Sequence, residues 1–172
     1  MKLWQAAGFS LATLGGTLLH FLYDWTGGSI LAAAFSGVNE STWEHMKLLY
    51  FPMLLFSLVQ RRFFRDQENF WCVKLLGMAL GLALIPVLFY TLNGVLGKTP
   101  DWVNIAIFYV TAAVVYYTEF RLFEAGRPER CRSGLAFVAI CLIGALFILF
   151  TFATPRIPLF QDPVSGRYGY FV

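Results

Sequence analysis

The sequence has 172 residues, of which 58% are hydrophobic and only 13% are charged, and its mean hydropathy is +0.64. An ordinary soluble domain carries about 25% charged residues. The composition therefore excludes that class and indicates an integral membrane protein whose length suits one compact domain. The formal net charge of +3 is too small to indicate a nucleic-acid partner.

Five apolar segments are long enough to cross a bilayer, which takes about 20 residues of helix. We expect these segments near Leu3–Tyr23, Thr42–Gln60, Phe70–Leu92, Trp102–Phe123 and Leu135–Phe152. The first could be mistaken for a secretory signal, but its apolar run is longer than such signals carry. The predicted fold class is an all-α integral membrane protein, with five transmembrane helices in a domain over residues 1–154 and a multi-pass location in the cell membrane.

The loops between these segments predict the orientation. Three arginines lie in "RRFFRDQE" after the second segment, and four lie in "RLFEAGRPERCRS" after the fourth. The opposite side has only Lys47, Lys98, Arg156 and Arg167. Because basic loops stay on the cytoplasmic side of a membrane, we expect the arginine loops and the N-terminus to be cytoplasmic and the C-terminus to be extracytoplasmic.

Two further pieces are expected on the extracytoplasmic side. The stretch Gly27–Val38 is apolar but too short to span a bilayer, and glycines bracket it, so we interpret it as a short interfacial or re-entrant helix. Residues 155–172 form a proline-containing tail with several large apolar side chains. Burying a Leu or Phe side chain is worth roughly 1.5–3 kcal/mol. We therefore expect this tail to fold back on the bundle, across or beside the polar cluster described next.

The stretch "HFLYDWTGGSILAAAFSGVNESTWEHMKLLYFP" contains both histidines of the chain together with three carboxylates. His20 and Asp24 have i, i+4 spacing at the outer end of the first segment, and Glu40 and Glu44 have the same spacing at the start of the second, where His45 follows. All five residues are therefore expected within a turn or two of one membrane surface.

This set of side chains is compatible with a metal site. Two neutral imidazoles and one carboxylate are a common zinc set that leaves a fourth position open to water. We predict His20, His45 and Asp24 as ligands of zinc or another divalent metal, and Asp24, Glu40 and Glu44 as candidate catalytic carboxylates, of which one would be a ligand and another would move protons. No HExxH register is present, and which carboxylate is the ligand and which is the base stays open.

The same residues also have structural explanations. Glu44 has the position of a capping-box glutamate, so it can simply begin a helix. His20 with Asp24 can be a hydrogen-bonded pair, and Glu40 with Lys47 can be a solvated surface pair. These explanations do not account for the gathering of both histidines and three carboxylates at one surface, and ionisable residues at membrane depth are functional candidates.

Three residues deeper in the segments have simpler interpretations. Glu119, near the inner end of the fourth segment, is expected to pair with Arg121 or to reach the membrane surface. Gly77 and Gly81 lie one helical turn apart, which lets another helix approach closely. That helix could belong to the same chain or to a second copy.

The cysteines and the absence of internal repeats argue against several classes of protein. No pair among the three cysteines has the spacing of a metal finger or a redox motif, so we expect no disulfide. No internal repeat is present, which disfavours a transporter built from inverted repeats. The expected partners are the lipid bilayer and a lipid or lipid-linked substrate, without nucleic acid, and a homo-oligomer stays open.

The runs "HFLYDWTG", "VNESTWEHMKLLYFP" and "IPLFQDPVSGRYGYF" resemble those of a family of small bacterial integral-membrane proteins of unknown function. The resemblance covers most of the chain and implies a bacterial inner-membrane protein, but it brings no assigned activity and no functional residues. The alkaline-ceramidase-like hydrolases resemble the chain only in having His and acidic residues near a membrane surface. The chain lacks the third histidine that such a site needs.

Three hypotheses about function follow. The first is a membrane-embedded, metal-dependent hydrolase or acyl transferase that acts at the extracytoplasmic face on a lipid or lipid-linked substrate. The second is a proton- or cation-coupled small transporter or ion-binding membrane protein, and the third is a non-catalytic membrane partner subunit. The second, third and fifth segments are almost purely apolar through their middles, and Glu119 is the only deep acid. This pattern favours a site on one side of the membrane over a path through it.

Overall fold

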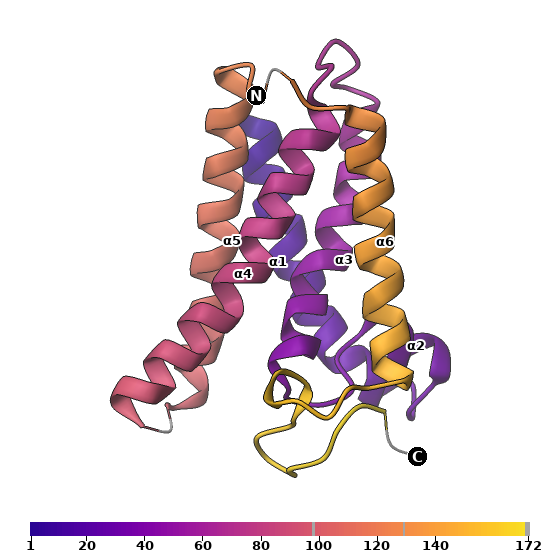
Figure 1. Cartoon of the computed structure of the whole chain (residues 1–172), viewed down its shortest axis with the longest axis vertical. Helices are drawn as coiled ribbons and strands as arrows, with labels where there is room; N and C mark the ends of the chain where they lie inside the picture. The colour runs from indigo at the N-terminus through magenta and orange to yellow at the C-terminus, as the bar shows by residue number, and fades with distance from the viewer. Residues whose placement is uncertain (98, 129, 171–172) are drawn as a thin grey trace.

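The computed structural model describes residues 1–97, 99–128 and 130–170, so Lys98 and the last two residues of the predicted tail lie outside the described part. The described chain is a helical bundle (Figure 1), whose elements in order are α1 (Lys2–Trp25), α2 (Ile30–Phe35), α3 (Thr42–Arg61), α4 (Phe70–Leu96), α5 (Asp101–Glu124), α6 (Ser133–Phe152) and the short 3₁₀ helix η1 (Pro158–Phe160).

Each of the five predicted apolar segments coincides with one long helix, to within four residues at either end. Four of these helices, α1, α4, α5 and α6, are long and apolar enough to cross a membrane. Helix α3 has 20 residues, but Glu44, His45 and Lys47 near its start lower its hydropathy. A fifth span therefore stays a prediction, while the all-helical fold is confirmed.

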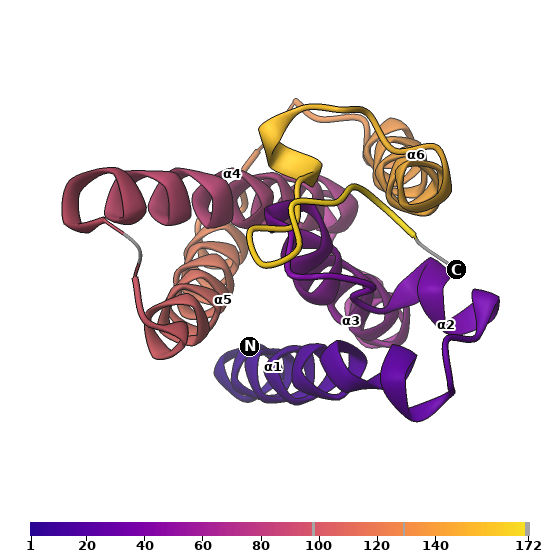
Figure 2. The ribbon, with the colours of Figure 1, turned by 90° about the horizontal axis from the view of Figure 1, so that it is seen from below.

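Helix α3 forms the centre of the bundle. It contacts α1, α4, α5 and α6, and the end-on view in Figure 2 shows it between α1 on one side and α4 and α6 on the other. Its residues Leu49, Tyr50 and Met53 are each 1% exposed and belong to the main apolar core. Because the other helices surround α3, its polar residues can be buried against protein rather than lipid.

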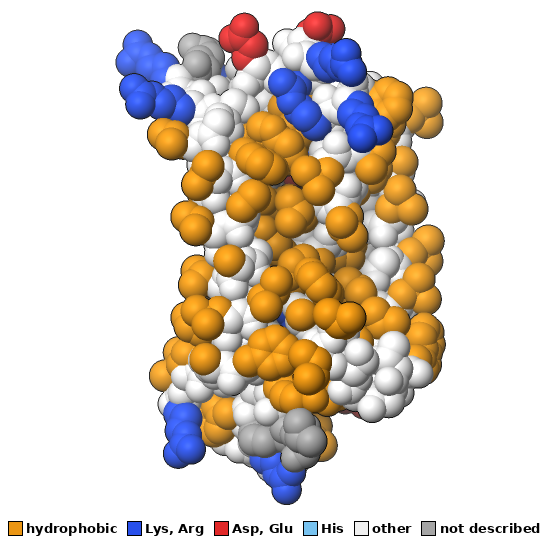
Figure 3. All heavy atoms as spheres, turned by 90° about the vertical axis from the view of Figure 1, so that its right-hand side faces the viewer, with side chains coloured by type: hydrophobic (Ala, Val, Ile, Leu, Met, Phe, Trp, Pro, Cys, Tyr) orange, Lys and Arg blue, Asp and Glu red, His pale blue; other side chains and the backbone are white. Residues whose placement is uncertain are grey.

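The outer surface of the bundle is apolar over most of its length. Exposed side chains on the surrounding helices include Leu14, Val110 and Leu142, which are 61%, 54% and 60% exposed. Figure 3 shows the face that includes α6, where an apolar band separates charged side chains gathered near the two ends. Such extended apolar surface is typical of a protein surrounded by lipid, and it is consistent with a membrane protein.

The two ends of the bundle differ in composition. We call the end that carries the N-terminus and the loops 62–69 and 125–132 the arginine end. The opposite end carries the α1–α2–α3 connection and the C-terminal tail, and we call it the histidine end (Figure 1).

A disulfide joins Cys72 in α4 to Cys131 before α6, with the two Cα atoms 6.1 Å apart. The prediction of no disulfide is therefore wrong. The two cysteines are separated by 59 positions in the sequence, so no local spacing motif could reveal them. The packing of α4 against α6 brings them within the range that a disulfide requires.

Helix α4 packs closely against its neighbours at two glycines. A Cβ atom on Gly77 would lie 2.5 Å from Oε1 of Glu119, and one on Gly81 would lie 2.9 Å from Cδ2 of Leu49. Both distances are too short for a real Cβ atom. The close approach predicted for these glycines is thus made within the chain, by α5 and α3.

The described part of the tail lies against the histidine end. The Phe160 ring in η1 is 4.6 Å from the Trp43 ring of α3. Asn39 Nδ2 donates a hydrogen bond to the Gly169 carbonyl over 3.1 Å. The Tyr170 amide donates to the carbonyl of Thr151 in α6 over 3.0 Å. These contacts connect the tail to α3, α6 and the loop before α3.

Candidate site at the histidine end

His20, Glu40 and His45 meet at the surface of the histidine end. His20 Nε2 lies 3.7 Å from Glu40 Oε1, and His45 Nε2 lies 3.5 Å from Glu40 Oε2. The two imidazole rings are 5.7 Å apart between centroids. The three side chains are 32%, 48% and 27% exposed, in chain order, so the cluster is half-buried but open to small molecules.

The local sequence explains how these residues come together. Gly27 and Gly28 have φ values of +65° and +81°, which glycine adopts without strain, and they end α1 in a tight turn. Ser41 caps α3 by accepting a hydrogen bond from the Glu44 amide over 3.4 Å. Glu40 therefore stands just before the first turn of α3, facing the last turns of α1.

The surroundings of His45 indicate which of its two ring nitrogens carries the hydrogen. Its Nδ1 lies 3.0 Å from the Ser41 carbonyl oxygen, which can only accept, so Nδ1 carries a hydrogen. In the neutral imidazole, Nε2 is then an acceptor, and it faces the carboxylate of Glu40, which is also an acceptor when ionised. The two atoms are 3.5 Å apart and partly exposed, so a water molecule or a cation between them would give both acceptors a partner.

Glu44, one of the predicted catalytic carboxylates, belongs to a separate and fully buried group. Its carboxylate pairs with Lys47 Nζ over 2.5 Å, and both side chains are almost completely buried. Glu44 also accepts hydrogen bonds from the Val38 amide and the Thr151 hydroxyl. Lys47 Nζ donates further bonds to the Ala33 carbonyl and to Thr151 Oγ1, each over 2.9 Å.

This buried group joins α3 to α2, α6 and the loop before α3. Every polar atom of the Glu44–Lys47 pair has at least one partner, so the pair has the properties of a structural connection. The structure thus separates Glu44 from the two histidines, although the helical spacing in the sequence places all of them near one surface.

Asp24, the predicted third ligand, is exposed at the end of α1. Among the described residues its carboxylate has no ion-pair partner within 4.0 Å. The i, i+4 spacing from His20 puts it on the same helical face but one turn further along the axis. Of the five predicted site residues, the structure therefore brings together His20, Glu40 and His45.

A metal centre requires several ligand side chains that converge on one point. Residues 1–97, 99–128 and 130–170 are the part of the chain that the structure describes. In that part of the chain, no group of three or more His, Cys, Asp or Glu side chains is arranged to hold a metal ion. Ligand atoms at 2.0–2.1 Å from a tetrahedral zinc ion are about 3.3 Å apart. The 3.5 Å and 3.7 Å separations at Glu40 are wider than this by a few tenths of an ångström.

A pocket of about 430 Å³ lies beside the tail at the same end, lined by Phe152, Thr154, Arg156, Arg167, Tyr168 and Tyr170. The Tyr170 ring is 6.0 Å from the ring of Tyr23 in α1, one turn from His20. The pocket thus presents two guanidinium groups and two phenols, which are suitable partners for a phosphate or a carboxylate.

A second buried ion pair lies near the arginine end. Lys74 Nζ is 2.6 Å from Glu119 Oε2, and both side chains are 0% exposed. Four aromatic rings lie within 6 Å of the ammonium, those of Phe56, Phe70, Tyr116 and Phe123. Stacked over aromatic rings and paired with a carboxylate, the ammonium is well stabilised.

The prediction that Glu119 pairs with Arg121 or reaches the membrane surface is therefore wrong. Arg121 donates a hydrogen bond to the Tyr117 hydroxyl over 3.0 Å, while Glu119 turns inward to Lys74. The sequence contained a usable signal, because Lys74 is the only charged residue in α4. A lysine inside an apolar helix requires an acidic partner, and Glu119 is the only acid deep in another segment.

An apolar core separates the two ends. Leu49, Met53 and Phe56 of α3 belong to one continuous apolar cluster, and they lie between Lys47 and the level of Lys74. Phe56 itself contacts the Lys74 ammonium. The polar groups of the histidine end and those of the arginine end thus form two separate clusters with apolar side chains between them.

The comparison with known proteins places the chain in a family without assigning an activity. No curated protein and no solved structure matches the chain. A family described as "Family of unknown function (DUF6512)" matches residues 1–170, which is nearly the whole chain. The sequence resemblance to a family of unknown function is thereby confirmed, and the chain belongs to the DUF6512 family.

Proposed function

We propose that this protein spans a bacterial inner membrane five times, with α1, α3, α4, α5 and α6 as the spans and the arginine end in the cytoplasm. Five arginines in the two loops, with Arg61 and Arg121 in the last turns of the helices before them, support this orientation. The short helix α2, whose Ile30 and Leu31 are 64% and 78% exposed, would lie at the extracytoplasmic interface.

The disulfide favours the opposite orientation, because such bonds persist in oxidising compartments. The proposal follows the arginines, because the charge asymmetry between the loops on the two sides sets the overall orientation of a membrane protein. An impermeant thiol reagent tests the choice on a background without native cysteines. A cysteine at exposed Val164 should react from outside intact cells, and one at exposed Asp66 should not. The reverse pattern contradicts the proposed orientation.

We infer that the histidine end is a metal-dependent active site of a hydrolase or acyl transferase. The observation that carries the proposal is that Nε2 of both histidines faces one carboxylate, while His45 Nδ1 donates to a backbone carbonyl. Metal-bound histidines commonly hold their second ring nitrogen in this way. A His₂–carboxylate set for zinc or another divalent metal requires both Nε2 atoms, which face different oxygens of Glu40, to close on one ion.

The chemistry of such a set is hydrolytic. A divalent metal with an open position lowers the pKa of a bound water and polarises a carbonyl group. Glu40 replaces Asp24 as the proposed carboxylate ligand, and the buried ion pair of Glu44 with Lys47 removes Glu44 from the proposed chemistry. The half-buried site faces the membrane surface, which suits an ester or amide near a lipid headgroup.

The substrate class follows from the neighbouring pocket. Arg156 and Arg167 line a cavity of about 430 Å³ at the same end, and guanidinium groups recognise phosphate. We therefore propose a phosphate-bearing lipid or lipid-linked substrate, whose headgroup occupies this pocket. A path for ions through the protein is disfavoured, because the apolar core separates the polar centres.

The proposal is tested by turnover. Full-length protein would be loaded with zinc and mixed with vesicles of total bacterial lipid extract, and lipid products would be measured by mass spectrometry. We expect release or transfer of acyl chains that disappears with a chelator, returns with zinc, and is absent in His45→Ala. Exposed Glu68 at the arginine end provides the control, and Glu68→Gln should retain turnover. Lipid composition that is identical for the wild type and His45→Ala would contradict the proposed activity.

A further inference from the structure

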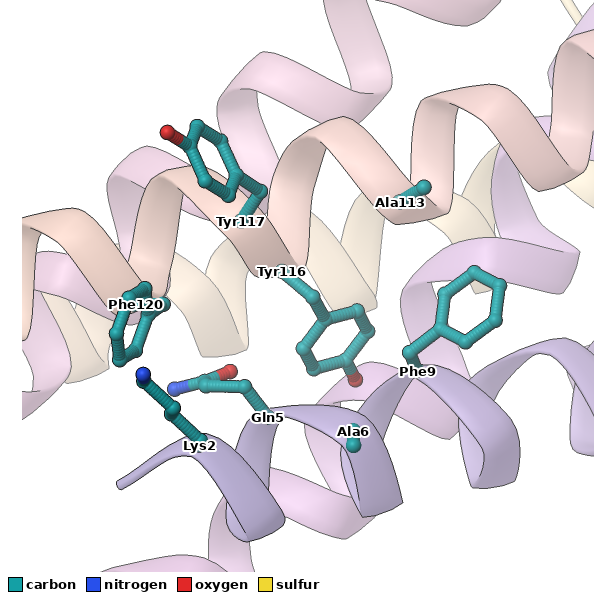
Figure 4. Close-up of a pocket in the computed structure, with 8 residues that line it drawn as sticks. All are labelled: Lys2, Gln5, Ala6, Phe9, Ala113, Tyr116, Tyr117 and Phe120. Atoms are coloured by element: carbon teal, nitrogen blue, oxygen red, sulfur yellow. The ribbon is translucent and has the colours of Figure 1, made fainter.

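A groove between α1 and α5 at the arginine end contains buried polar atoms that lack partners. Gln5 is 5% exposed and Tyr116 is 3% exposed. Within the described residues, neither the amide oxygen and nitrogen of Gln5 nor the hydroxyl of Tyr116 has a hydrogen-bond partner. Both residues line a cavity of about 310 Å³ (Figure 4). Buried polar groups normally have partners, and a molecule bound in this cavity would supply the partners that the described residues do not.

The groove changes in polarity along its length. Lys2 and Phe120 lie at the end of the bundle, Gln5 and Tyr116 lie one turn deeper, and Phe9 lies deeper again (Figure 4). Lys2 and Phe9 are seven positions apart, which corresponds to about 10 Å along a helix. A cation, then neutral hydrogen-bonding groups, and then apolar side chains follow one another from the end toward the middle.

The mouth of the groove carries one lining cation, Lys2. Tyr117 also lines the groove, but its hydroxyl points away from Lys2 and Gln5 (Figure 4) and accepts a hydrogen bond from the Arg121 guanidinium over 3.0 Å. The ammonium of Lys2 at the mouth attracts an anionic group.

We propose that this groove binds one anionic glycerophospholipid from the surrounding bilayer. Its phosphate lies at Lys2, and its ester region receives hydrogen bonds from the Gln5 amide and the Tyr116 hydroxyl. One acyl chain follows Phe9 and the apolar part of the groove toward the middle of the bundle. The order of these three chemistries in a phospholipid matches the order of the lining residues. This site is distinct from the histidine end and does not depend on the activity proposed there.

The test uses the purified full-length protein in nanodiscs or detergent and measures phosphatidylglycerol binding by native mass spectrometry and thermal unfolding. We expect phosphatidylglycerol to bind and to raise the unfolding temperature more than phosphatidylcholine does. Gln5→Leu and Tyr116→Phe should each weaken phosphatidylglycerol binding by about tenfold, since each removes a hydrogen bond to the lipid. Without lipid, Gln5→Leu should unfold at the wild-type temperature or slightly above, because it removes buried atoms that lack partners.

Gln60 provides a matched control. It is 0% exposed, and both atoms of its side-chain amide also lack partners among the described residues, but it does not line the groove. Gln60→Leu should therefore bind phosphatidylglycerol like the wild type. Unchanged binding in both Gln5→Leu and Tyr116→Phe would overturn the proposal, as would equal stabilisation by phosphatidylcholine. Stabilisation by inorganic phosphate alone would also overturn it, because the ligand would then be a free anion.

Discussion

The two ends of the bundle each bury a lysine beside a glutamate, but they satisfy these charges differently. At the histidine end, Lys47 and Glu44 pair with each other and make four further polar contacts with α2, α6 and the loop before α3. At the arginine end, Lys74 has Glu119 and four aromatic rings, and Glu119 Oε1 lacks a partner among the described residues.

This difference distinguishes buried polar groups that hold the helices together from buried polar groups that could bind another molecule. The satisfied pair at the histidine end connects several elements and leaves the chemistry to the half-exposed cluster of His20, Glu40 and His45. At the arginine end, Glu119, Gln5 and Tyr116 all have unpartnered atoms, and two of these residues line a groove. Where such atoms line a groove, a bound molecule that supplies their missing hydrogen bonds would lower the free energy.

The largest expected effect is on Lys47. Lys47→Met should lower the free energy of unfolding by about 3–5 kcal/mol, because it leaves Glu44 buried without its counter-charge. Denaturation in detergent, followed by tryptophan fluorescence, measures the change. The double variant Lys47→Met/Glu44→Leu should recover much of the loss, since no buried charge is left unpaired. A single variant as stable as the wild type would show that the connection at the histidine end is not structural.

The disulfide lies at the arginine end and should stabilise the folded protein. Cys131→Ser should lower the free energy of unfolding of the oxidised protein by about 2–4 kcal/mol, because the bond closes a long loop in the unfolded chain. Addition of a reductant should produce the same loss in the wild type and no loss in the variant. Cys141 is exposed and free, so Cys141→Ser is the control. A reductant effect in Cys131→Ser would contradict this assignment.

Neutralising Glu44 and neutralising Glu119 should lower the free energy of unfolding by different amounts, and this difference should be smaller than the two effects above. Glu44→Gln should destabilise the protein more than Glu119→Gln, by about 1–2 kcal/mol, because Glu44 accepts bonds from three groups and Glu119 from one. The rings around Lys74 also continue to stabilise its ammonium after Glu119 is neutralised. Both unfolding curves are measured in the same detergent. Equal losses would remove the distinction between the two pairs.

Asp24 should give the smallest effect. Asp24→Asn should change the free energy of unfolding by less than about 0.5 kcal/mol, as is usual for an exposed side chain without a specific partner. Metal uptake should also be unchanged, because the proposed carboxylate ligand is Glu40. Loss of metal in this variant, measured by elemental analysis, would restore Asp24 to the site.

Periodicity and hydropathy predicted the long helices well, because the apolar segments are long and the polar loops between them are distinct. The gathering of His20 and His45 could also be predicted, since both lie near the same end of adjacent segments. Helical spacing could not decide among the carboxylates. Glu40 lies outside α3 in a loop whose path depends on the turn at Gly27 and Gly28, and Glu44 turns inward to Lys47.

The disulfide could not be found by periodicity, and the Lys74–Glu119 pair had to be inferred from the lone lysine of α4 rather than from spacing. Cys72 and Cys131 are 59 positions apart, and only the packing of α4 on α6 brings them together. Glu119 has Arg121 as its neighbour in sequence, but burial directs its side chain toward the bundle. Gly77 leaves room for this side chain, a relation that depends on the register between α4 and α5.

The metal content of the purified protein tests the central claim most directly, which is that His20, Glu40 and His45 form a metal site at the histidine end. After equilibration with zinc and removal of free metal, elemental analysis should give about one ion per chain. His45→Ala and Glu40→Gln should retain roughly a tenth of this or less, since a ligand is lost. Wild-type protein without bound metal, or equal metal in His45→Ala, would contradict the account.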